Sequence, residues 1–246
     1  MREKSVLVTG ASSGIGRAVA VSLSEKNVRV VLVARSKEGL SETVEMMSDS
    51  NSHVMIPFDL CDTENIGKIF AEIQEEGICL NGMVHCAGIS RITPLRTFSQ
   101  ANAMELFNIH YFAFMELVKW YAKKGISEGG SIVGISSINV HTPQKCMTAY
   151  ASAKAAMETA CRTLALELAE KNIRINSVVV GGVSTAMGKG TQDLLKGIES
   201  NYQNPVGRQL LGTGKPEQIA QVIDFLLSDD SSFITGREIY ADGGLL

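Results

Sequence analysis

A tyrosine and a lysine four residues apart give the clearest chemical signal in the sequence. They bound the run YASAK, from Tyr150 to Lys154, and residues four apart on a helix lie on the same face. An ammonium beside a phenol stabilises the phenolate, so we expect the pKa of Tyr150 to fall below its ordinary value of about 10. Such a phenol can exchange a proton near neutral pH. Ser137 ends the strand-like run SIVGISS thirteen residues upstream, with Ser136 as its competitor.

A glycine-rich turn near the N-terminus is the second candidate site. The segment 9–16 reads TGASSGIG and stands between a short apolar run and a stretch with helical spacing. Glycines let the chain turn tightly and let a diphosphate approach the backbone, while the helix that follows offers free N–H groups. A turn that binds no ligand also uses glycine, but the position of this turn directly after the first predicted strand favours a binding site. The residues expected to bind the diphosphate are Gly10, Ser12, Ser13, Gly14, Ile15 and Gly16.

Short apolar runs alternate with helical stretches along the chain and position these residues. The strand-like runs are 5–9, 28–33, 53–57, 82–86, 131–136, 173–180 and 237–241. The helical stretches are 14–26, 37–49, 63–76, 101–124, 150–171 and 216–227. Strands joined by helices form parallel sheets covered on both faces. The sequence therefore predicts an α/β fold, a doubly wound Rossmann-type parallel sheet of about seven strands, in a single domain (1–246).

Composition and charge narrow the function classes. The chain has 246 residues, 45% hydrophobic and 20% charged, which is enough to bury a sizeable core. A net charge of −3 gives no basic surplus for nucleic acid or an anionic membrane. No apolar run approaches the roughly 20 residues of a membrane helix. Five scattered cysteines favour reduced thiols in a cytoplasmic protein, and we expect no metal site, since the neighbours His85 and Cys86 would point to opposite faces of a strand.

The spacing TGxxxGxG, together with YxxxK, resembles the short-chain dehydrogenase/reductase family in its short single-domain branch, and the resemblance extends along the whole chain. It implies an oxidoreductase that interconverts a carbonyl and a secondary alcohol. By this resemblance, Ser137 polarises the substrate oxygen, Tyr150 donates the proton, and Lys154 tunes Tyr150 and holds the nicotinamide ribose. Asn108, in the run ELFNIHYF, matches the family's fourth catalytic residue, which helps to hold a water that connects the lysine to solvent. A polar residue at a helix–helix contact is the alternative for Asn108.

The end of the second predicted strand bears on the choice of dinucleotide. An acidic residue there binds both ribose hydroxyls and repels a 2′-phosphate, but this chain has Ala34, followed by Arg35 and Ser36. A guanidinium pairs well with phosphate, so we expect NADP(H). An ordinary solvated loop residue is the alternative for Arg35, and a turn or cap residue for Asp59. The resemblance implies further cofactor contacts at Asp59, Leu60, Ala87, Gly88, Val183 and Thr185.

Two motifs depart from the family's pattern. His85 and Cys86 stand where the family has an asparagine pair, and Cys86 replaces the asparagine that braces the central sheet. His85 can donate one hydrogen bond but lacks amide geometry, so we expect some loss of stability with activity retained. Gly181 stands where the family has proline, which favours a more mobile loop before Thr185. The following segment, 184–214, is rich in glycine and polar residues and too long for an ordinary connection, so we expect a substrate lid there.

The substrate and the assembly are less well specified. The resemblance implies a 3-oxoacyl thioester on acyl carrier protein, which Lys123, Lys124 and Lys171 would help to bind, although solvated lysines at helix ends are the alternative. A sugar, polyol or small ketone stays open, as does a non-catalytic nucleotide-binding regulatory protein on the same fold. The complete Asn-Ser-Tyr-Lys set argues against the regulatory protein. Apolar surface on the segments 101–124, around Phe107, Phe112 and Phe114, and 150–171 predicts dimerisation by helix pairing, and the resemblance implies a homotetramer.

Overall fold

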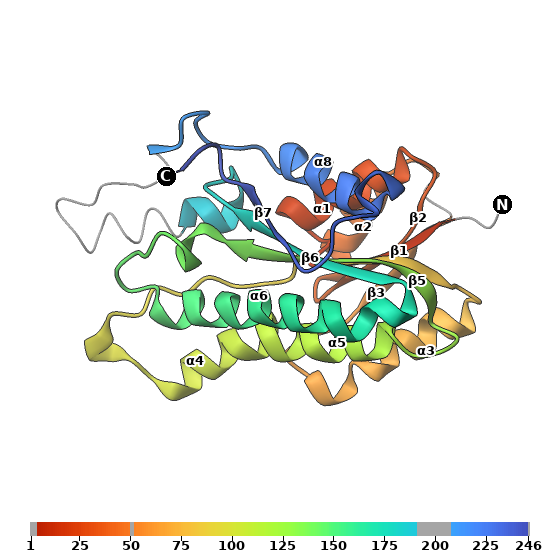
Figure 1. Ribbon diagram of the computed structural model, residues 1–246, viewed down its shortest axis with the longest axis horizontal. Coiled ribbons are helices and arrows are strands. Elements are labelled where there is room, and N and C mark those ends of the chain that lie inside the picture. The colour runs from red at the N-terminus through yellow and green to blue at the C-terminus, as the bar shows by residue number, and fades with distance from the viewer. Residues whose placement is uncertain (1–3, 50–51, 191–207, 246) are drawn as a thin grey trace.

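Seven parallel strands form one sheet in the order β3-β2-β1-β4-β5-β6-β7 in the computed structural model, which describes residues 4–49, 52–190 and 208–245 (Figure 1). The order reverses between β1 and β4, the place where doubly wound sheets bind ligands at their carboxyl edge. The strands are β1 (Ser5–Thr9), β2 (Arg29–Ala34), β3 (Val54–Pro57), β4 (Leu80–His85), β5 (Ser127–Ser137), β6 (Ile173–Val180) and β7 (Glu238–Ala241). The predicted α/β fold and strand number are confirmed.

Helices cover both faces of the sheet and create two apolar cores. One face carries α1 (Gly14–Ser24), α2 (Lys37–Glu45) and α8 (Pro216–Leu227), and the other carries α3 (Gly67–Glu75), α4 (Gln100–Phe107), α5 (Ala113–Tyr121) and α6 (Thr148–Leu168) (Figure 1). Successive residues of a strand point to opposite faces. In β1, Leu7 therefore packs in the core beneath α5 and α6, whereas Val6 and Val8 pack beneath α1 and α8. No helix in the described part of the chain is long and apolar enough to span a membrane.

The predicted helix 101–124 is helical over residues 100–121, but its hydrogen-bonding pattern changes in the middle. Between α4 and α5 lies a π-turn, Asn108–Phe112, in which the Ala113 N–H donates to the Asn108 carbonyl. The wider turn shifts which side chains face the sheet, and such turns are frequent at functional sites. Within this turn Ile109 and His110 are buried, and Phe112 is exposed. Phe114 lies in the core, so the expected contribution of Phe114 to an apolar surface is wrong.

Candidate active site

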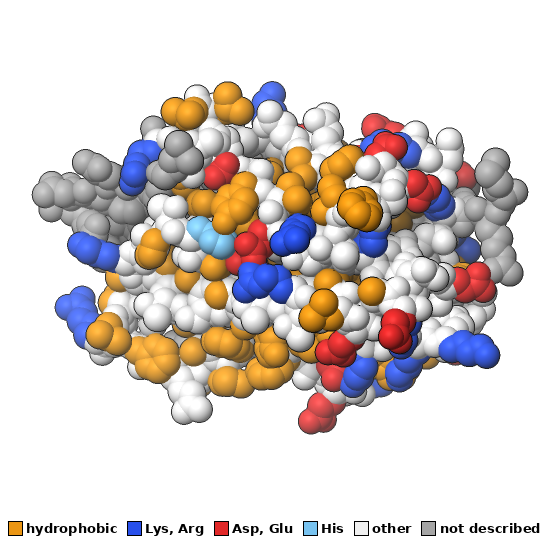
Figure 2. Space-filling model, in the orientation of Figure 1, with side chains coloured by type: hydrophobic (Ala, Val, Ile, Leu, Met, Phe, Trp, Pro, Cys, Tyr) orange, Lys and Arg blue, Asp and Glu red, His pale blue; other side chains and the backbone are white. Residues whose placement is uncertain are grey.

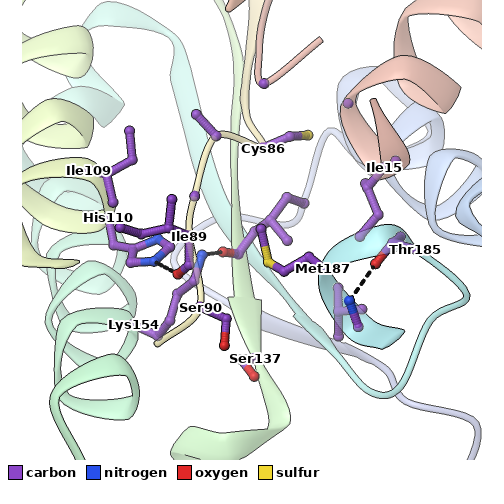
Figure 3. Close-up of a pocket in the computed structure, with 18 of the residues that line it drawn as sticks. Ile15, Cys86, Ile89, Ser90, Ile109, His110, Ser137, Lys154, Thr185 and Met187 are labelled. Carbon is purple, nitrogen blue, oxygen red and sulfur yellow. Dashed lines mark hydrogen bonds between the residues drawn. The ribbon is translucent and has the colours of Figure 1, made fainter. Parts of the chain in front are cut away.

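A cavity of about 1030 Å³ opens at the carboxyl ends of the strands, where the strand order reverses. The glycine-rich turn, the ends of β2 and β5, the loops after β3, β4 and β6, the π-turn and the start of α6 line it. Figure 3 shows Ile15, Cys86, Ser137, Lys154 and Thr185 projecting toward this space from different elements. Of the site residues that the sequence predicts, all line the cavity except Asn108.

The glycine-rich turn has the geometry of an anion site. Gly10 has a φ of +66°, and a Cβ there would lie 2.8 Å from the backbone of Ala87. A Cβ at Gly16 would lie 2.3 Å from the Gly10 carbonyl oxygen, so neither position accepts a side chain. Ser13 caps α1 without a side-chain hydrogen bond, so the N–H groups of the first turn remain available to a ligand.

Arg17 connects the glycine-rich turn to α2 through hydrogen bonds and an ion pair. Its guanidinium donates to the Ser12 carbonyl oxygen at 2.5 Å and pairs with the Glu42 carboxylate at 2.8 Å. The bond to Thr43 Oγ1, at 3.0 Å, adds a third contact with the neighbouring segment. Arg17 is therefore engaged in bracing the turn, and it does not line the cavity.

The rim at the end of β2 carries positive charge. Ala34 is buried, Arg35 is exposed at the cavity wall, and no described residue forms a hydrogen bond or an ion pair with Arg35. Ser36 is the N-cap of α2, and its Oγ accepts the Gly39 N–H at 3.0 Å. The helix dipole thus adds to the charge of Arg35 at the same rim. The exposed carboxylate of Glu38, which accepts the Ser36 hydroxyl at 3.2 Å, opposes it.

Asp59 is both a turn residue and a residue of the cavity wall, the two roles that the sequence left open for it. Its Oδ1 accepts the Cys61 N–H at 3.0 Å, which is the local bond of a turn residue. Its side chain is exposed and also lines the cavity, next to the buried Leu60. The turn therefore fixes a carboxylate at the same wall as Arg35.

Ser137 and Tyr150 meet at the wall between β5 and α6. Burial raises the pKa of Tyr150 above its usual value of 10, and a hydrogen bond with Ser137 opposes the rise. Ser136 is bonded instead to the carboxylate of Glu158, which is buried within α6. The structure therefore places Ser137, and not Ser136, beside the phenol.

Lys154 is 4% exposed, one helical turn after Tyr150. Its Nζ donates to the Ile135 carbonyl oxygen at 2.5 Å, which holds the ammonium against the β5 backbone. Burial lowers its pKa to about 8, opposed by Cys86 and Glu158. The expectation that the pKa of Tyr150 falls below its ordinary value is contradicted, because burial outweighs the hydrogen bond with Ser137 and raises that pKa.

His85 links β1, β4 and the π-turn. Its Nε2 lies 2.9 Å from the Ile109 carbonyl oxygen, which only accepts, so Nε2 carries the proton and Nδ1 accepts from the Thr9 hydroxyl at 3.0 Å. Thr9 Oγ1 in turn accepts the Ala87 N–H at 3.2 Å. His85 therefore braces the sheet with both nitrogens. The thiol of its neighbour Cys86 has a pKa raised to about 12 by burial, which argues against a reactive thiolate.

The π-turn brings His110, rather than Asn108, to the cavity. Asn108 is half-buried and does not line it, so the proposed role of Asn108 stays a prediction. The His110 ring lies edge-on to the Tyr150 ring at 5.4 Å between centroids, and its Nε2 lies 2.8 Å from the Ile89 carbonyl oxygen. The sequence reasoning missed His110. The only sequence signal for His110 was that it is a single histidine within an apolar helical run. A histidine in such a run is usually a core residue, so the signal is weak.

The loop after β6 completes the wall. Thr185 lies beside Gly14, and its Oγ1 accepts the Gly188 N–H at 3.1 Å. Val183 forms a β-bridge with Gly214. The Gln209 side chain accepts the Gly182 N–H at 2.5 Å and donates to the Gly212 carbonyl at 2.7 Å, which holds the loop that lacks the expected proline. Of the predicted lid 184–214, residues 191–207 lie outside the described part.

Known proteins with the same architecture match nearly the whole chain. A family model described as enoyl-(acyl carrier protein) reductase matches residues 10–246. Carbonyl reductase family member 4 of Xenopus laevis is 34% identical over 97% of this chain and 96% of its own. The 3-oxoacyl-(acyl-carrier-protein) reductase FabG of Thermotoga maritima is 33% identical over 99% and 98%. A solved short-chain dehydrogenase/reductase from Brucella melitensis, named as a glucose/ribitol dehydrogenase, superposes with a TM-score of 0.89 at 30% identity, covering 99% and 96%.

Proposed function

Because this chain belongs to the short-chain dehydrogenase/reductase family of oxidoreductases, we propose that it uses NADP(H) to interconvert a carbonyl group and a secondary alcohol. The observation that carries the proposal is the meeting of Ser137, Tyr150 and Lys154 in the cavity that also contains the glycine-rich turn. We also propose that residues 1–246 form a single NADP(H)-binding domain with a substrate lid around 184–214, and that the protein is cytoplasmic.

The cavity residues fit a nicotinamide dinucleotide from one end to the other. The diphosphate would lie at the N-terminus of α1, against a turn whose close backbone packing requires glycine at positions 10 and 16. The adenosine end would lie against Arg35, Ser36, Asp59 and Leu60, and the nicotinamide end against Ala87, Gly88, Val183 and Thr185. The bound dinucleotide supplies the hydride, and the protein supplies position and proton transfer.

The proton chemistry follows from two opposite pKa shifts. Tyr150, whose pKa is raised, is protonated at neutral pH and can give its proton to a carbonyl oxygen that Ser137 polarises. Lys154 remains a cation below pH 8, where it stabilises the phenolate that Tyr150 leaves. Reduction should therefore slow as the pH rises through about 8 and Lys154 loses its charge.

Ala34 and Arg35 are the residues from which we infer a preference for NADP(H) over NAD(H). Dissociation constants for NADPH and NADH, measured by fluorescence titration, test this preference. Arg35→Ala should weaken NADPH binding by about 10- to 100-fold, because a charge-assisted bond to phosphate contributes about 1.5–3 kcal/mol. NADH binding should change little. Arg96→Ala, which removes an exposed guanidinium outside the cavity wall, is the matched control. Equal or tighter binding of NADH by the unaltered protein would refute the proposal.

Substitution of Ala34 by aspartate tests the same rim in the opposite direction. Ala34 is buried at the end of β2 and lines the cavity, so the new carboxylate would face the adenosine ribose. It would accept hydrogen bonds from the ribose hydroxyls and repel a 2′-phosphate. Ala34→Asp should therefore shift the ratio of the two dissociation constants toward NADH, and an unchanged ratio would count against this placement of the ribose.

For the substrate we propose a 3-oxoacyl thioester, supported by the similarity to the Thermotoga maritima reductase. The lysines expected to bind a carrier protein are partly engaged, since Lys123 lies over the Trp120 ring and Lys171 bonds to the Ala122 carbonyl. A sugar or polyol is the second candidate, favoured by the Brucella melitensis neighbour. Turnover of acetoacetyl thioesters, sugars and diketones, followed by NADPH absorbance, decides between them. Absence of turnover on any carbonyl would favour the non-catalytic nucleotide-binding protein.

We also propose that the chain pairs through α4, α5 and α6 within a homotetramer. Figure 2 shows hydrophobic side chains gathered over these helices. Met104, Phe112 and Leu166 are 41%, 41% and 79% exposed, more apolar surface than these helices need in a monomer. Light scattering at micromolar concentration should give a mass above that of one chain, and a stable monomer would contradict the proposal.

A further inference from the structure

The loop that follows β6 continues to pair with neighbouring backbone beyond the end of the strand. The Gly181 N–H donates to the Ala241 carbonyl oxygen of β7 at 3.3 Å. The Gly182 carbonyl accepts the Gly214 N–H at 3.0 Å, and the Ser184 N–H donates to the Gly214 carbonyl at 2.9 Å. Among the described residues, no backbone carbonyl accepts the Gly182 N–H. This donor therefore needs a partner other than backbone.

Gln209 supplies that partner with its side chain. Its Oε1 accepts the Gly182 N–H at 2.5 Å, and its Nε2 donates to the Gly182 carbonyl at 3.3 Å and to the Gly212 carbonyl at 2.7 Å. The carboxamide thus pairs with both backbone groups of Gly182, as a neighbouring strand would. Exchanging its oxygen and nitrogen would set a donor against the N–H and an acceptor against the two carbonyls, so its partners fix the orientation of the amide.

Glycines leave the space that this carboxamide fills. Gln209 is 7% exposed. A Cβ at Gly181 would lie 2.9 Å from its Oε1 and 2.8 Å from the Asp242 Cα, and a Cβ at Gly243 would lie 3.2 Å from its Nε2. Glycine at these two positions therefore makes room for the buried amide. Burial costs a glutamine its side-chain entropy, and the hydrogen bonds to Gly182 and Gly212 offset that cost.

The position of Gly182 fixes the part of the loop that forms the cavity wall. Val183 and Thr185 follow it and line the cavity, and the Thr185 N–H donates to the Val183 carbonyl at 2.8 Å. Thr185 packs against the glycine-rich turn, since a Cβ at Gly14 would lie 3.4 Å from its Cγ2. Figure 3 shows Thr185 on the same side of the cavity as Ile15 of that turn. A shift of Gly182 would therefore move this wall relative to the turn.

We propose that Gln209 is a positioning residue whose carboxamide holds Gly182, so that Val183 and Thr185 are placed for the nicotinamide end of the dinucleotide. The inference rests on the proposed function, which assigns that end of the cavity to the nicotinamide. Gln209 acts through this loop and not on the adenosine end, where Arg35 lines the cavity. Loss of its hydrogen bonds should therefore weaken the binding of a whole dinucleotide and spare the binding of its adenosine part.

The binding test compares NADPH with adenosine 2′,5′-bisphosphate, which has the adenosine end and no nicotinamide. Gln209→Met keeps a side chain of similar length and loses the bonds to Gly182 and Gly212. The dissociation constant for NADPH should rise about 5- to 30-fold, the effect of losing one or two hydrogen bonds. That for the bisphosphate should stay within about twofold, because the altered loop lies at the other end of the cavity. Leu211→Ala, which removes an exposed side chain outside the cavity wall, is the matched control and should change neither constant.

Two outcomes of this comparison would overturn the proposal. An unchanged dissociation constant for NADPH would show that the loop does not need the carboxamide. Equal losses for NADPH and for the bisphosphate would show that Gln209 supports the whole cavity instead of its nicotinamide end. If the unaltered protein prefers NADH, then NADH and AMP take the places of the two ligands, so a wrong NADP(H) preference leaves the comparison intact.

Amide hydrogen exchange, followed by NMR in the cofactor-free protein, tests the contact itself and does not depend on the proposed function. In the unaltered protein the Gly182 N–H should be protected from exchange, as the Gly181 N–H is by its bond to Ala241. In Gln209→Met the Gly182 N–H should exchange at least about tenfold faster, with Gly181 unchanged. Unprotected exchange of the Gly182 N–H in the unaltered protein would overturn the proposal, even if Gln209→Met fails to fold.

Discussion

Replacing Lys154 by methionine should make the protein more stable while abolishing turnover. Burial lowers the pKa of this lysine from 10.5 to about 8, which means that the fold holds the charged form at a cost. At about 1.4 kcal/mol per pKa unit the cost is about 3 kcal/mol. Methionine fills a similar volume without charge, but it loses the bond to the Ile135 carbonyl, which is worth about 1.5–3 kcal/mol because its donor is charged. We expect a net gain of at most about 2 kcal/mol at pH 7.

The gain should depend on pH in a definite direction. Below pH 8, Lys154 is charged in both the folded and the unfolded chain, and the cost of burying the charge is fully present. Between pH 8 and 10.5 the folded chain releases the proton before the unfolded chain does, so the original protein becomes more stable as the pH rises. Above 10.5 lysine is neutral in both states. The stability advantage of Lys154→Met should therefore shrink from pH 8 upward and reverse before pH 10.5, because uncharged lysine keeps its bond to the Ile135 carbonyl without the cost of burying a charge.

Urea unfolding followed by circular dichroism, at pH 7 and at pH 10, measures this difference. Other groups also titrate in this range, but their contributions cancel between the two proteins. Lys124→Met, at an exposed position, is the matched control and should show no pH-dependent difference. The reasoning is refuted if Lys154→Met is less stable than the original at pH 7, or if its advantage is the same at both pH values.

Three other substitutions test the neighbouring groups. Tyr150→Phe removes only the hydroxyl, so turnover should fall by about two to four orders of magnitude with NADPH binding unchanged, and near-original activity would exclude Tyr150 as the acid. The Glu158 carboxylate raises the pKa of Lys154, so Glu158→Gln should lower that pKa further. In a plot of turnover against pH, the loss of activity at alkaline pH should then begin at lower pH. An unchanged alkaline limb would contradict this coupling. His85→Leu loses the bonds to Thr9 and Ile109 and should lower the free energy of unfolding by about 2–4 kcal/mol. His85→Asn keeps part of the hydrogen bonding and should lower it less. Equal losses in the two variants would show that these bonds do not determine the stability.

The sequence predicts the fold and most of the cavity wall because those features have local signals. Alternating apolar runs predict the parallel sheet, and β1, β6 and α8 begin and end as expected. The glycine spacing predicts a tight turn, and the positive φ of Gly10 shows that the turn needs glycine at this position. Tyr150 and Lys154 share a helix face because their spacing is set within one helix. In each case the responsible residues are neighbours along the chain.

The features that the sequence does not predict depend on contacts between distant segments. Apolar spacing continues through 101–124, so nothing local indicates the π-turn that turns Asn108 away from the cavity and His110 toward it. The partners of His85 follow from the register that places Thr9 opposite it, which requires the strand order. The raised pKa of Tyr150 comes from burial that the whole fold creates.

The two buried imidazoles also determine how the protein responds to acid. Burial lowers the pKa of His85 to about 3 and holds that of His110 well below 6.5, so both rings stay uncharged in the folded chain. Once unfolded, each ring takes up a proton below about pH 6.5. Acid therefore favours the unfolded chain by mass action, and the stability that these rings contribute above pH 6.5 is lost as the pH falls toward 3. Through its two rings, which join the π-turn to β4 and to the loop that follows β4, the protein is therefore more stable at neutral pH than in acid.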